Sequence, residues 1–221
     1  LEKEITAVVY DSRKIVEGCL FVCIKGANLD GHQAAAEAAE KKAAAIIVSK
    51  EVELPEQTET TLIRVEDTRY ALAFVSAAWF DHPAKKLTTI GITGTKGKTT
   101  TTYLVKSILE NAGRKVGLVG TIEIIIGDTH IHAVNTTPES YLLQEYFAKM
   151  VESGCDTVVM EVSSQALMLH RTQGFVFDFG IFTNLEPDHI GPNEHGSFEE
   201  YAHCKSLLFQ QCRVGIANVD D

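Results

Sequence analysis

The segment from Lys86 to Gly113 constrains the fold of this chain most, because it reads as a strand, a tight turn and a long helix in direct succession. The apolar run KLTTIGI is followed by TGTKGK and then by TTTTYLVKSILENAG, where Gly113 is typical of a helix C-terminus. Glycines in such a turn let backbone N–H groups point toward a phosphate, and the positive end of the helix dipole strengthens the attraction. The segment therefore predicts a phosphate-binding loop.

The side chains of this loop indicate which phosphate it takes. Lys98 would neutralise the β and γ oxygens of ATP, and Thr99 would hold Mg²⁺. The spacing is G-x-x-G-K-T, shorter than the strict G-x-x-x-x-G-K-[ST] form, because position 92 is isoleucine. The alternative is the glycine turn of a dinucleotide fold, but that motif reads G-x-G-x-x-G and does not explain the Lys-Thr pair. We therefore predict ATP binding by Gly94, Thr95, Lys96, Gly97, Lys98, Thr99 and Thr100.

The chain before this segment reads as a small α/β unit of its own. Apolar runs that predict strands alternate there with runs that predict helices, and the stretch DHPAKK then interrupts both patterns as a linker does. The strands are expected at 19–24 and 61–65, the helices at about 34–45 and 69–80, and the linker at 81–86. We therefore predict two domains, residues 1–86 and 87–221.

The second domain continues the alternation of strands and helices. Strands are expected at 116–120, 157–161, 179–183 and 214–218, with one helix N-capped by Thr137 and another opened by a Ser197–Glu200 capping box. Such alternation predicts an α/β fold with a doubly wound, mostly parallel sheet, in which ligands bind beyond the carboxyl ends of the strands. The last residues follow a strand without a covering helix, so we expect a truncated second domain.

Charge and composition exclude several classes of function. The 20 Lys and Arg residues against 30 Asp and Glu give a net charge of −10, which argues against duplex nucleic acid as a partner. No apolar run approaches the roughly 18 residues that cross a bilayer, and the first residues lack the layout of a signal peptide. The 5 cysteines are scattered without a C-x-x-C pair, which favours reduced thiols. We therefore expect a cytoplasmic protein that contacts no membrane.

Two strand ends carry polar residues near the predicted loop. Glu161 ends TVVME, and a carboxylate at that place is typical of a Mg²⁺ ligand. His189 follows FGIFT-NLEPD and, taken alone, is better explained by a structural role. His189, His195 and His203 together have a spacing that fits no common zinc site.

Lys205 is unusual because it falls within an apolar stripe of the helix that Ser197 opens. The apolar positions follow i, i+3, i+4 spacing, which places the lysine on the inward face. A lone buried ammonium is costly, so the amine pairs with a carboxylate, reaches out to an edge of the core, or changes its chemistry. The pattern itself leaves these readings open.

Taken together, these motifs resemble the Mur ligase family. The segments that carry the resemblance are DSRKIVEGCLFVCIKG, GITGTKGKTTTT, NTTPES, MEVSSQAL with His170-Arg171, FTNLEPDH and EEYAHCKSLLF. The resemblance runs over the whole chain and is strongest to members that add the third residue of the peptidoglycan stem peptide. It departs at Leu169, where related ligases often have glutamine, and the loop KGANLDG lacks the His-Gln-Ala that some members use near uracil.

The resemblance implies roles for individual residues. Lys98, Glu161, His189 and Lys205 would be catalytic, with Lys205 carbamylated. Thr99, Glu161, His189 and the Lys205 carbamate would hold Mg²⁺. Contacts to the UDP-muramyl peptide would come from Ser12, Asn135, Thr136, Thr137, Ser163 and Arg171.

The resemblance also implies a reaction. ATP would phosphorylate the terminal carboxylate of UDP-N-acetylmuramoyl-L-alanyl-D-glutamate, and the amine of L-lysine or meso-diaminopimelate would attack the acyl phosphate to give an amide, ADP and phosphate. The family's third domain would follow residue 221, so this chain alone is expected to be inactive. The protein is expected to be a monomer. Two alternatives stay open: another Mur or folylpolyglutamate-type ligase, and a non-catalytic nucleotide-binding module of the same fold.

Overall fold

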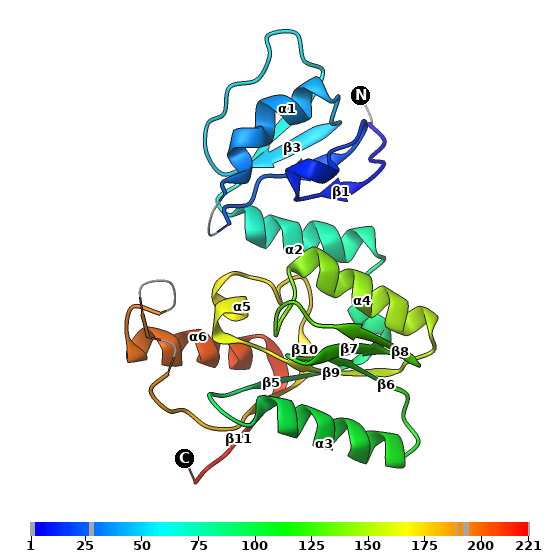
Figure 1. Ribbon diagram of the computed structural model, residues 1–221, viewed down its shortest axis with the longest axis vertical. Coiled ribbons are helices and arrows are strands. Elements are labelled where there is room, and N and C mark those ends of the chain that lie inside the picture. Colours follow the sequence, from blue (N-terminus) through cyan, green and yellow to red (C-terminus); the bar gives the residue numbers. More distant parts are fainter. Residues whose placement is uncertain (1–2, 27–28, 189, 192–194, 221) are drawn as a thin grey trace. The chain divides into compact units, whose positions relative to one another are not determined.

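The computed structural model describes residues 3–26, 29–188, 190–191 and 195–220. Contacts between residues divide the chain into two compact units, Leu1–Val75 and Ser76–Asp221. Both units combine helices with sheets (Figure 1), and this confirms the α/β class. The domain boundary at Lys86 stays a prediction.

The first unit is built on a fully parallel sheet of four strands in the order β1-β2-β3-β4. All four residues of β3 are buried, and the alanines of α1 pack closely over Phe21 and Ile46. The strands are β1 (Val8–Val9), β2 (Leu20–Val22), β3 (Ala45–Val48) and β4 (Thr61–Arg64), and the helices are η1 (Ser12–Lys14), η2 (Gly31–Ala34) and α1 (Ala35–Glu40). Helix α2 (Thr68–Trp79) begins in this unit and ends in the second.

The helix predicted to reach Ala45 is shorter than expected. It ends at Glu40, and Lys42 takes a left-handed conformation with φ 59° that breaks the helical path. Ala45 then begins β3, where it pairs with Leu20 and Thr61. The alanines carry no signal that separates the end of the helix from the start of the strand.

The second unit contains a seven-stranded sheet in the order β11-β10-β5-β9-β6-β7-β8. The five strands from β11 to β6 are parallel, and β7 and β8 form an antiparallel hairpin that the sequence analysis did not predict. The strands are β5 (Thr88–Thr93), β6 (Val116–Val119), β7 (Glu123–Ile126), β8 (Thr129–His132), β9 (Thr157–Glu161), β10 (Phe177–Phe182) and β11 (Cys212–Ala217). The expectation of a doubly wound, mostly parallel sheet is confirmed.

Helices cover this sheet from both sides, with α3 and α4 on opposite faces (Figure 1). Along β9, Val158 and Met160 belong to the core that α4 closes, whereas Val159 packs with Val105 and Leu109 of α3. This alternation is what a strand buried on both faces requires. The helices are η3 (Pro83–Lys86), α3 (Lys98–Asn111), α4 (Ser140–Glu152), α5 (Ser164–Met168) and α6 (Phe198–Gln210).

The two predicted helix caps differ in outcome. Ser197 caps α6, since its side chain accepts the N–H of Glu200 at 3.1 Å, although the Glu200 carboxylate accepts from Gly196 N rather than closing the box on Ser197. Thr137 is not an N-cap, because α4 begins at Ser140 with Glu139 before it.

Across the described residues, no helix has the length and apolarity needed to cross a bilayer.

Candidate active site

The phosphate-binding loop lies at the carboxyl end of β5, between the ends of β9 and β10. Gly94 and Gly97 have φ values of 148° and 78°, and Gly97 directly precedes the first residue of α3. A Cβ atom on Gly94 would lie 2.0 Å from Oγ1 of Thr183, so a larger residue does not fit. Both glycines are thus needed where the sequence analysis placed the phosphate.

A short segment after β10 braces this loop. Asn184 accepts the Lys96 N–H through Oδ1 at 2.8 Å and donates from Nδ2 to the Lys96 carbonyl at 3.0 Å. Thr183 Oγ1 donates to the same carbonyl at 3.0 Å, and the Glu186 carboxylate pairs with the Lys96 ammonium. The polar character of FTNLEPDH is evident from the sequence, but its contacts to Lys96 were not predicted.

The Lys98 ammonium is folded back onto its own loop. Its Nζ donates to the carbonyls of Gly94 and Thr95 at 2.9 and 3.0 Å. Burial lowers the pKa of Lys98, while the charges of Glu161 and Asp188 oppose that change. The ammonium therefore has neutral carbonyl partners that an anionic phosphate oxygen would replace at a gain.

Glu161 is 1% exposed and accepts hydrogen bonds from two neighbouring threonines. Thr99 Oγ1 donates to Oε2 at 2.9 Å, Thr121 N donates to Oε1 at 2.9 Å, and Thr121 Oγ1 donates to Oε2 at 3.1 Å. A Cβ atom on Gly120 would lie 2.6 Å from Oε1, so the glycine leaves room for the carboxylate. Thr121, which follows β6, was missed by the sequence analysis.

This oxygen set fits magnesium. Mg²⁺ prefers hard oxygen ligands and is commonly held by one or two protein groups together with substrate phosphates and water. Thr99 and Glu161 supply a hydroxyl and a carboxylate that already lie within hydrogen-bonding distance of each other. Within the part of the chain that the structure describes, no three His, Cys, Asp or Glu side chains gather into a metal site. His189 lies outside the described residues.

Lys205 is buried on α6, as the sequence pattern predicted, with 1% of its surface exposed. Its Nζ donates to the Gly94 carbonyl at 2.7 Å and lies 4.5 Å from the centre of the Tyr201 ring. Among the described residues no carboxylate pairs with it, which disfavours the ion-pair reading. Burial, with the nearby charge of Lys98, lowers the pKa of Lys205 to about 7, and Asp188 opposes the change.

Two adjoining cavities are lined by most of the predicted residues of the second unit, although Gly94 and Lys96 are not in their described lining. The first, of about 350 Å³, is lined by Thr95, Gly97, Lys98, Thr99, Thr100, Thr121, Thr136 and Glu161. The second, of about 220 Å³, is lined by Lys98, Asn135, Thr136, Thr137, Ser163, Ser164, Gln165, Arg171 and Lys205. Lys98 and Thr136 line both, so the cavities meet at the lysine of the loop.

Several residues predicted to contact the muramyl peptide also hold the backbone of the second cavity. Thr137 Oγ1 donates to the Glu161 carbonyl at 3.0 Å and accepts Ser163 N at 3.1 Å. Arg171 donates to the Thr137 carbonyl at 3.2 Å, and Ser163 caps α5 by accepting Ala166 N at 3.2 Å. Their contacts to substrate stay predictions.

The first unit holds the remaining predicted contact, Ser12, which begins η1 after the capping residue Asp11. A cavity of about 680 Å³ in this unit, bounded by residues from Lys3 to Thr60, does not include Ser12 in its described lining. The expected departure from the family at KGANLDG is wrong, because His32-Gln33-Ala34 follow this loop directly in the sequence. His32 is buried there and accepts Ser49 N at 3.0 Å.

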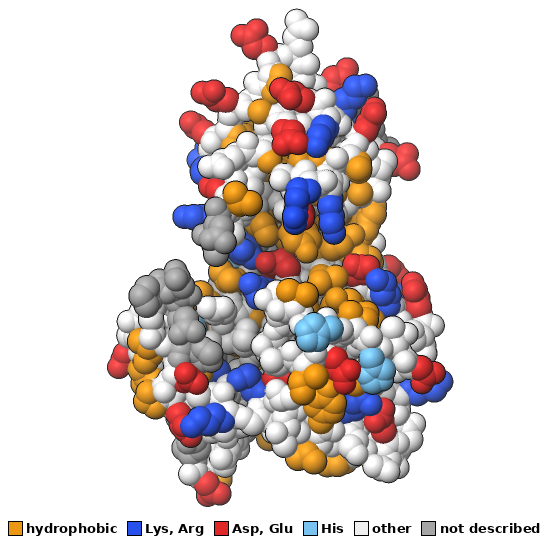
Figure 2. All heavy atoms as spheres, in the orientation of Figure 1, with side chains coloured by type: hydrophobic (Ala, Val, Ile, Leu, Met, Phe, Trp, Pro, Cys, Tyr) orange, Lys and Arg blue, Asp and Glu red, His pale blue; other side chains and the backbone are white. Residues whose placement is uncertain are grey.

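Charged side chains of both signs are mixed on the face of the molecule shown in Figure 2. On the face shown in Figure 2, lysines and arginines alternate with aspartates and glutamates rather than gathering into one basic area. At the second cavity, Lys98, Lys205 and Arg171 line the same space. Local positive charge therefore coincides with the predicted site although the chain carries −10 in total.

Comparison with known proteins gives matches along the chain. A model described as "Mur ligase family, catalytic domain" matches residues 4–80, and one described as "Mur ligase middle domain" matches residues 92–221. A UDP-N-acetylmuramoyl-L-alanyl-D-glutamate–2,6-diaminopimelate ligase of Clostridium perfringens is 47% identical over 220 residues, which are 100% of this chain and 45% of the relative. A ligase of the same name from Bacillus licheniformis is 48% identical over 95% of this chain and 42% of its own length.

Solved structures agree in fold. A structure titled UDP-N-acetylmuramoyl-L-alanyl-D-glutamate–2,6-diaminopimelate ligase covers 98% of this chain with a TM-score of 0.81 at 24% identity, over 44% of its own chain. MurF ligase from Thermotoga maritima in complex with ADP covers 99% with a TM-score of 0.59 at 22% identity, over 46% of its own chain. The chain spans about 45% of the length of the Clostridium perfringens relative and 42% of that of the Bacillus licheniformis relative.

Proposed function

Because the chain belongs to the Mur ligase family, we propose that its complete gene product is an ATP-dependent amide ligase of peptidoglycan precursor synthesis. The acceptor substrate is UDP-N-acetylmuramoyl-L-alanyl-D-glutamate, and the added amino acid is meso-diaminopimelate. The names of the Clostridium and Bacillus relatives support diaminopimelate over L-lysine, the other amino acid that the sequence left open.

The observation that carries this proposal is the position of Lys98, which lines both cavities. A ligase of this kind must bring a phosphoryl group and a carboxylate together at one place. The loop cavity suits the phosphates of ATP, and the second cavity, with Arg171 and Lys205 in its wall, suits a carboxylate. Lys98 stands where the two would meet.

The proposed reaction has two steps. In the first step, an oxygen of the substrate carboxylate attacks the γ phosphorus of ATP, the bond to the β-phosphate oxygen breaks, and ADP leaves. In the second step the amine of diaminopimelate attacks the acyl carbon, phosphate leaves, and the amine loses a proton as the amide forms. Lys98 exchanges its carbonyl partners for phosphate oxygens, and the loop N–H groups orient the nucleotide. No nucleophile from the protein is needed.

Thr99 and Glu161 are the residues that would hold Mg²⁺, and His189 is proposed to join them. When bound, Mg²⁺ offsets the negative charge that builds up on the transferred phosphoryl group. Thr121 keeps both oxygens of the Glu161 carboxylate in place through its N–H and its hydroxyl. The buried carboxylate is therefore oriented before the nucleotide arrives.

Lys205 is proposed to carry a carbamate. Its neutral amine would add to CO₂ and lose a proton, which leaves an anion able to bind a second Mg²⁺. Two observations support this role: the amine lines the second cavity, and its pKa of about 7 leaves much of it uncharged near neutral pH. The first unit is proposed to bind the UDP part through Ser12, and the protein is proposed to be a cytoplasmic monomer.

The test is ADP release by the complete gene product, supplied with ATP, Mg²⁺, the UDP-muramyl dipeptide and one amino acid at a time. We expect ADP to form with diaminopimelate and much less with L-lysine. Normal nucleotide binding without ADP release in either case would contradict the proposal and favour a non-catalytic nucleotide-binding module. Release that needs a folate-type or other acceptor would favour a different ligase of the family.

A further inference from the structure

Tyr201 is the largest fully buried side chain among the described residues, and the reaction proposed above gives it no part. It lies on α6, one turn before Lys205. Its hydroxyl and its ring each contact a different part of the site.

The hydroxyl of Tyr201 ties α6 to the phosphate loop. Its oxygen lies 3.0 Å from Oγ1 of Thr95. Thr95 Oγ1 donates to the Glu186 carbonyl at 3.2 Å and accepts Glu186 N at 3.0 Å. A hydroxyl has one hydrogen and accepts two bonds, so the tyrosine must be the donor to Thr95. The pair completes the hydrogen bonding of a buried loop side chain.

The ring of Tyr201 fixes the amine of Lys205. Nζ lies 4.5 Å from the ring centre and 2.7 Å from the Gly94 carbonyl, so the amine is held between the ring and the loop. An aromatic face attracts an ammonium, so the ring favours this position of the Lys205 amine. Lys205 is therefore linked to the loop and to Tyr201 at the same time.

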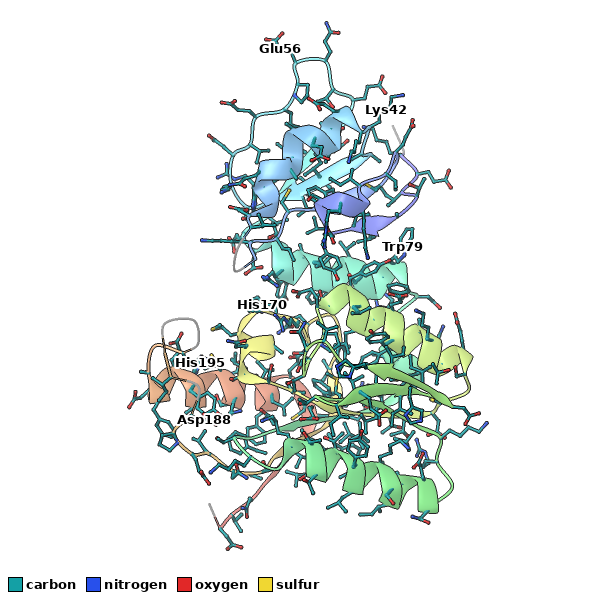
Figure 3. All side chains as sticks on the ribbon, viewed as in Figure 1. Lys42, Glu56, Trp79, His170, Asp188 and His195 are labelled. Carbon is teal, nitrogen blue, oxygen red and sulfur yellow. The ribbon has the colours of Figure 1, made fainter. Side chains whose placement is uncertain are left out.

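A third contact leads from Tyr201 to the second cavity. The ring of His195 lies 5.3 Å from the tyrosine ring, and Nε2 of His195 lies 2.8 Å from Oγ of Ser164, which lines that cavity. His195 is fully buried beside α6 (Figure 3). Packed side chains of this kind shift together when one of them is displaced.

From these contacts we propose that Tyr201 is a positioning residue that couples the phosphate loop to Lys205 and, through His195 and Ser164, to the second cavity. Filling of the loop by a nucleotide then changes the affinity of the second cavity for its ligand, and by linkage the reverse holds with the same factor. The identity of the two ligands rests on the proposed function; the coupling itself does not.

The first test needs no ligand. Hydrogen exchange of the amides of residues 94–100 is measured by mass spectrometry in the complete gene product, with Tyr201→Phe, Thr95→Val and the double variant. Tyr201→Phe removes one hydrogen bond and keeps the ring, so we expect exchange to become about fivefold faster. In the Thr95→Val background the same change should add nothing. Tyr146→Phe on α4 is the matched control and should leave loop exchange unchanged.

The second test measures the coupling. The affinity for the UDP-muramyl dipeptide is determined with and without ADP and Mg²⁺, and the ratio of the two is expected to approach one in Tyr201→Phe while Tyr146→Phe keeps the wild-type ratio. Unchanged loop exchange in Tyr201→Phe, or additive effects with Thr95→Val, would overturn the proposal. Faster exchange in a protein that forms no amide with either amino acid would sustain the positioning role and refute the ligase assignment instead.

Discussion

At the scale of single residues, Lys205 shows how the fold changes the chemistry of a side chain. An ordinary lysine has a pKa of 10.5, whereas burial and the charge of Lys98 lower that of Lys205 to about 7. Between these values the unfolded chain holds a proton that the folded chain has lost. Stability must therefore depend on pH across that window.

We predict that the destabilising effect of Lys205 is fully present below pH 7 and fades as the pH rises. Because the unfolded state binds more protons above pH 7, the free energy of unfolding of the wild type should rise relative to Lys205→Met by up to about 1.4 kcal/mol per pH unit. Urea unfolding between pH 6.5 and 9 in CO₂-free buffer measures this difference. Lys85→Met, at an exposed lysine, is the control. Parallel pH curves for wild type and Lys205→Met would contradict the prediction.

Glu161→Gln addresses the proposed magnesium site. The amide cannot supply the negative charge. Its NH₂ group is a donor and would face threonine hydroxyls that now donate to the carboxylate. We expect the Mg²⁺ concentration needed for half-maximal nucleotide binding to rise at least about tenfold. Calorimetry with ADP at several Mg²⁺ concentrations measures it. Glu145→Gln, on the surface of α4, should behave as wild type, and an unchanged Mg²⁺ dependence in Glu161→Gln would exclude Glu161 as a ligand.

At the scale of elements, the segment that follows β10 determines the shape of the phosphate loop. We predict that Asn184→Ala, which removes two hydrogen bonds to Lys96, raises the KM for ATP about tenfold. The KM for the UDP-muramyl dipeptide should change less than about twofold, because the lining of the second cavity does not include Asn184 or Lys96. Steady-state kinetics of the complete gene product separates the two constants. An equal rise in both would mean that the variant disturbs the whole site.

The sequence predicted the elements whose signal is local. The strand, loop and helix around Gly94 and Gly97 follow from periodicity and glycine spacing. Glu161 was predicted near the loop because ligands in such sheets bind beyond the carboxyl ends of the strands. The hairpin of β7 and β8 was missed because EIII does not alternate, although Gly127-Asp128 is a recognised two-residue turn signal.

The contacts that the sequence did not predict join residues far apart in the chain. Tyr201 lies in the helix predicted after Ser197, where the sequence pattern indicates only that it faces inward, yet its hydroxyl reaches Thr95 across 106 positions. Thr137 was read as a helix cap, but its hydroxyl is engaged by Glu161 and Ser163 instead. Local patterns show that such a side chain is polar or buried, and only the tertiary fold decides which partner it meets.

Across the whole molecule, residue contacts begin the second unit earlier in the chain than composition does. The composition places a boundary at Lys86, whereas residue contacts assign η3 to the second unit. In η3, Pro83 is buried and Ala84 packs against the core that α4 closes. Asp81 and His82 take left-handed conformations just before it, which turns the chain between α2 and η3.

These observations predict that a fragment 81–221 is more stable than a fragment 87–221. The shorter fragment exposes the core surface that Pro83 and Ala84 cover, a loss of about 1–2 kcal/mol of apolar burial. For a unit of this size that loss lowers the melting temperature by about 3–6 °C. Calorimetry of the two fragments measures the difference, and nucleotide binding checks that each retains the loop. Because η3 contributes nothing to the lining of either cavity, ADP affinity should be the same in both. Equal melting temperatures would place the boundary at Lys86, as the composition indicates, and would make η3 a linker rather than the first element of the unit that holds the site.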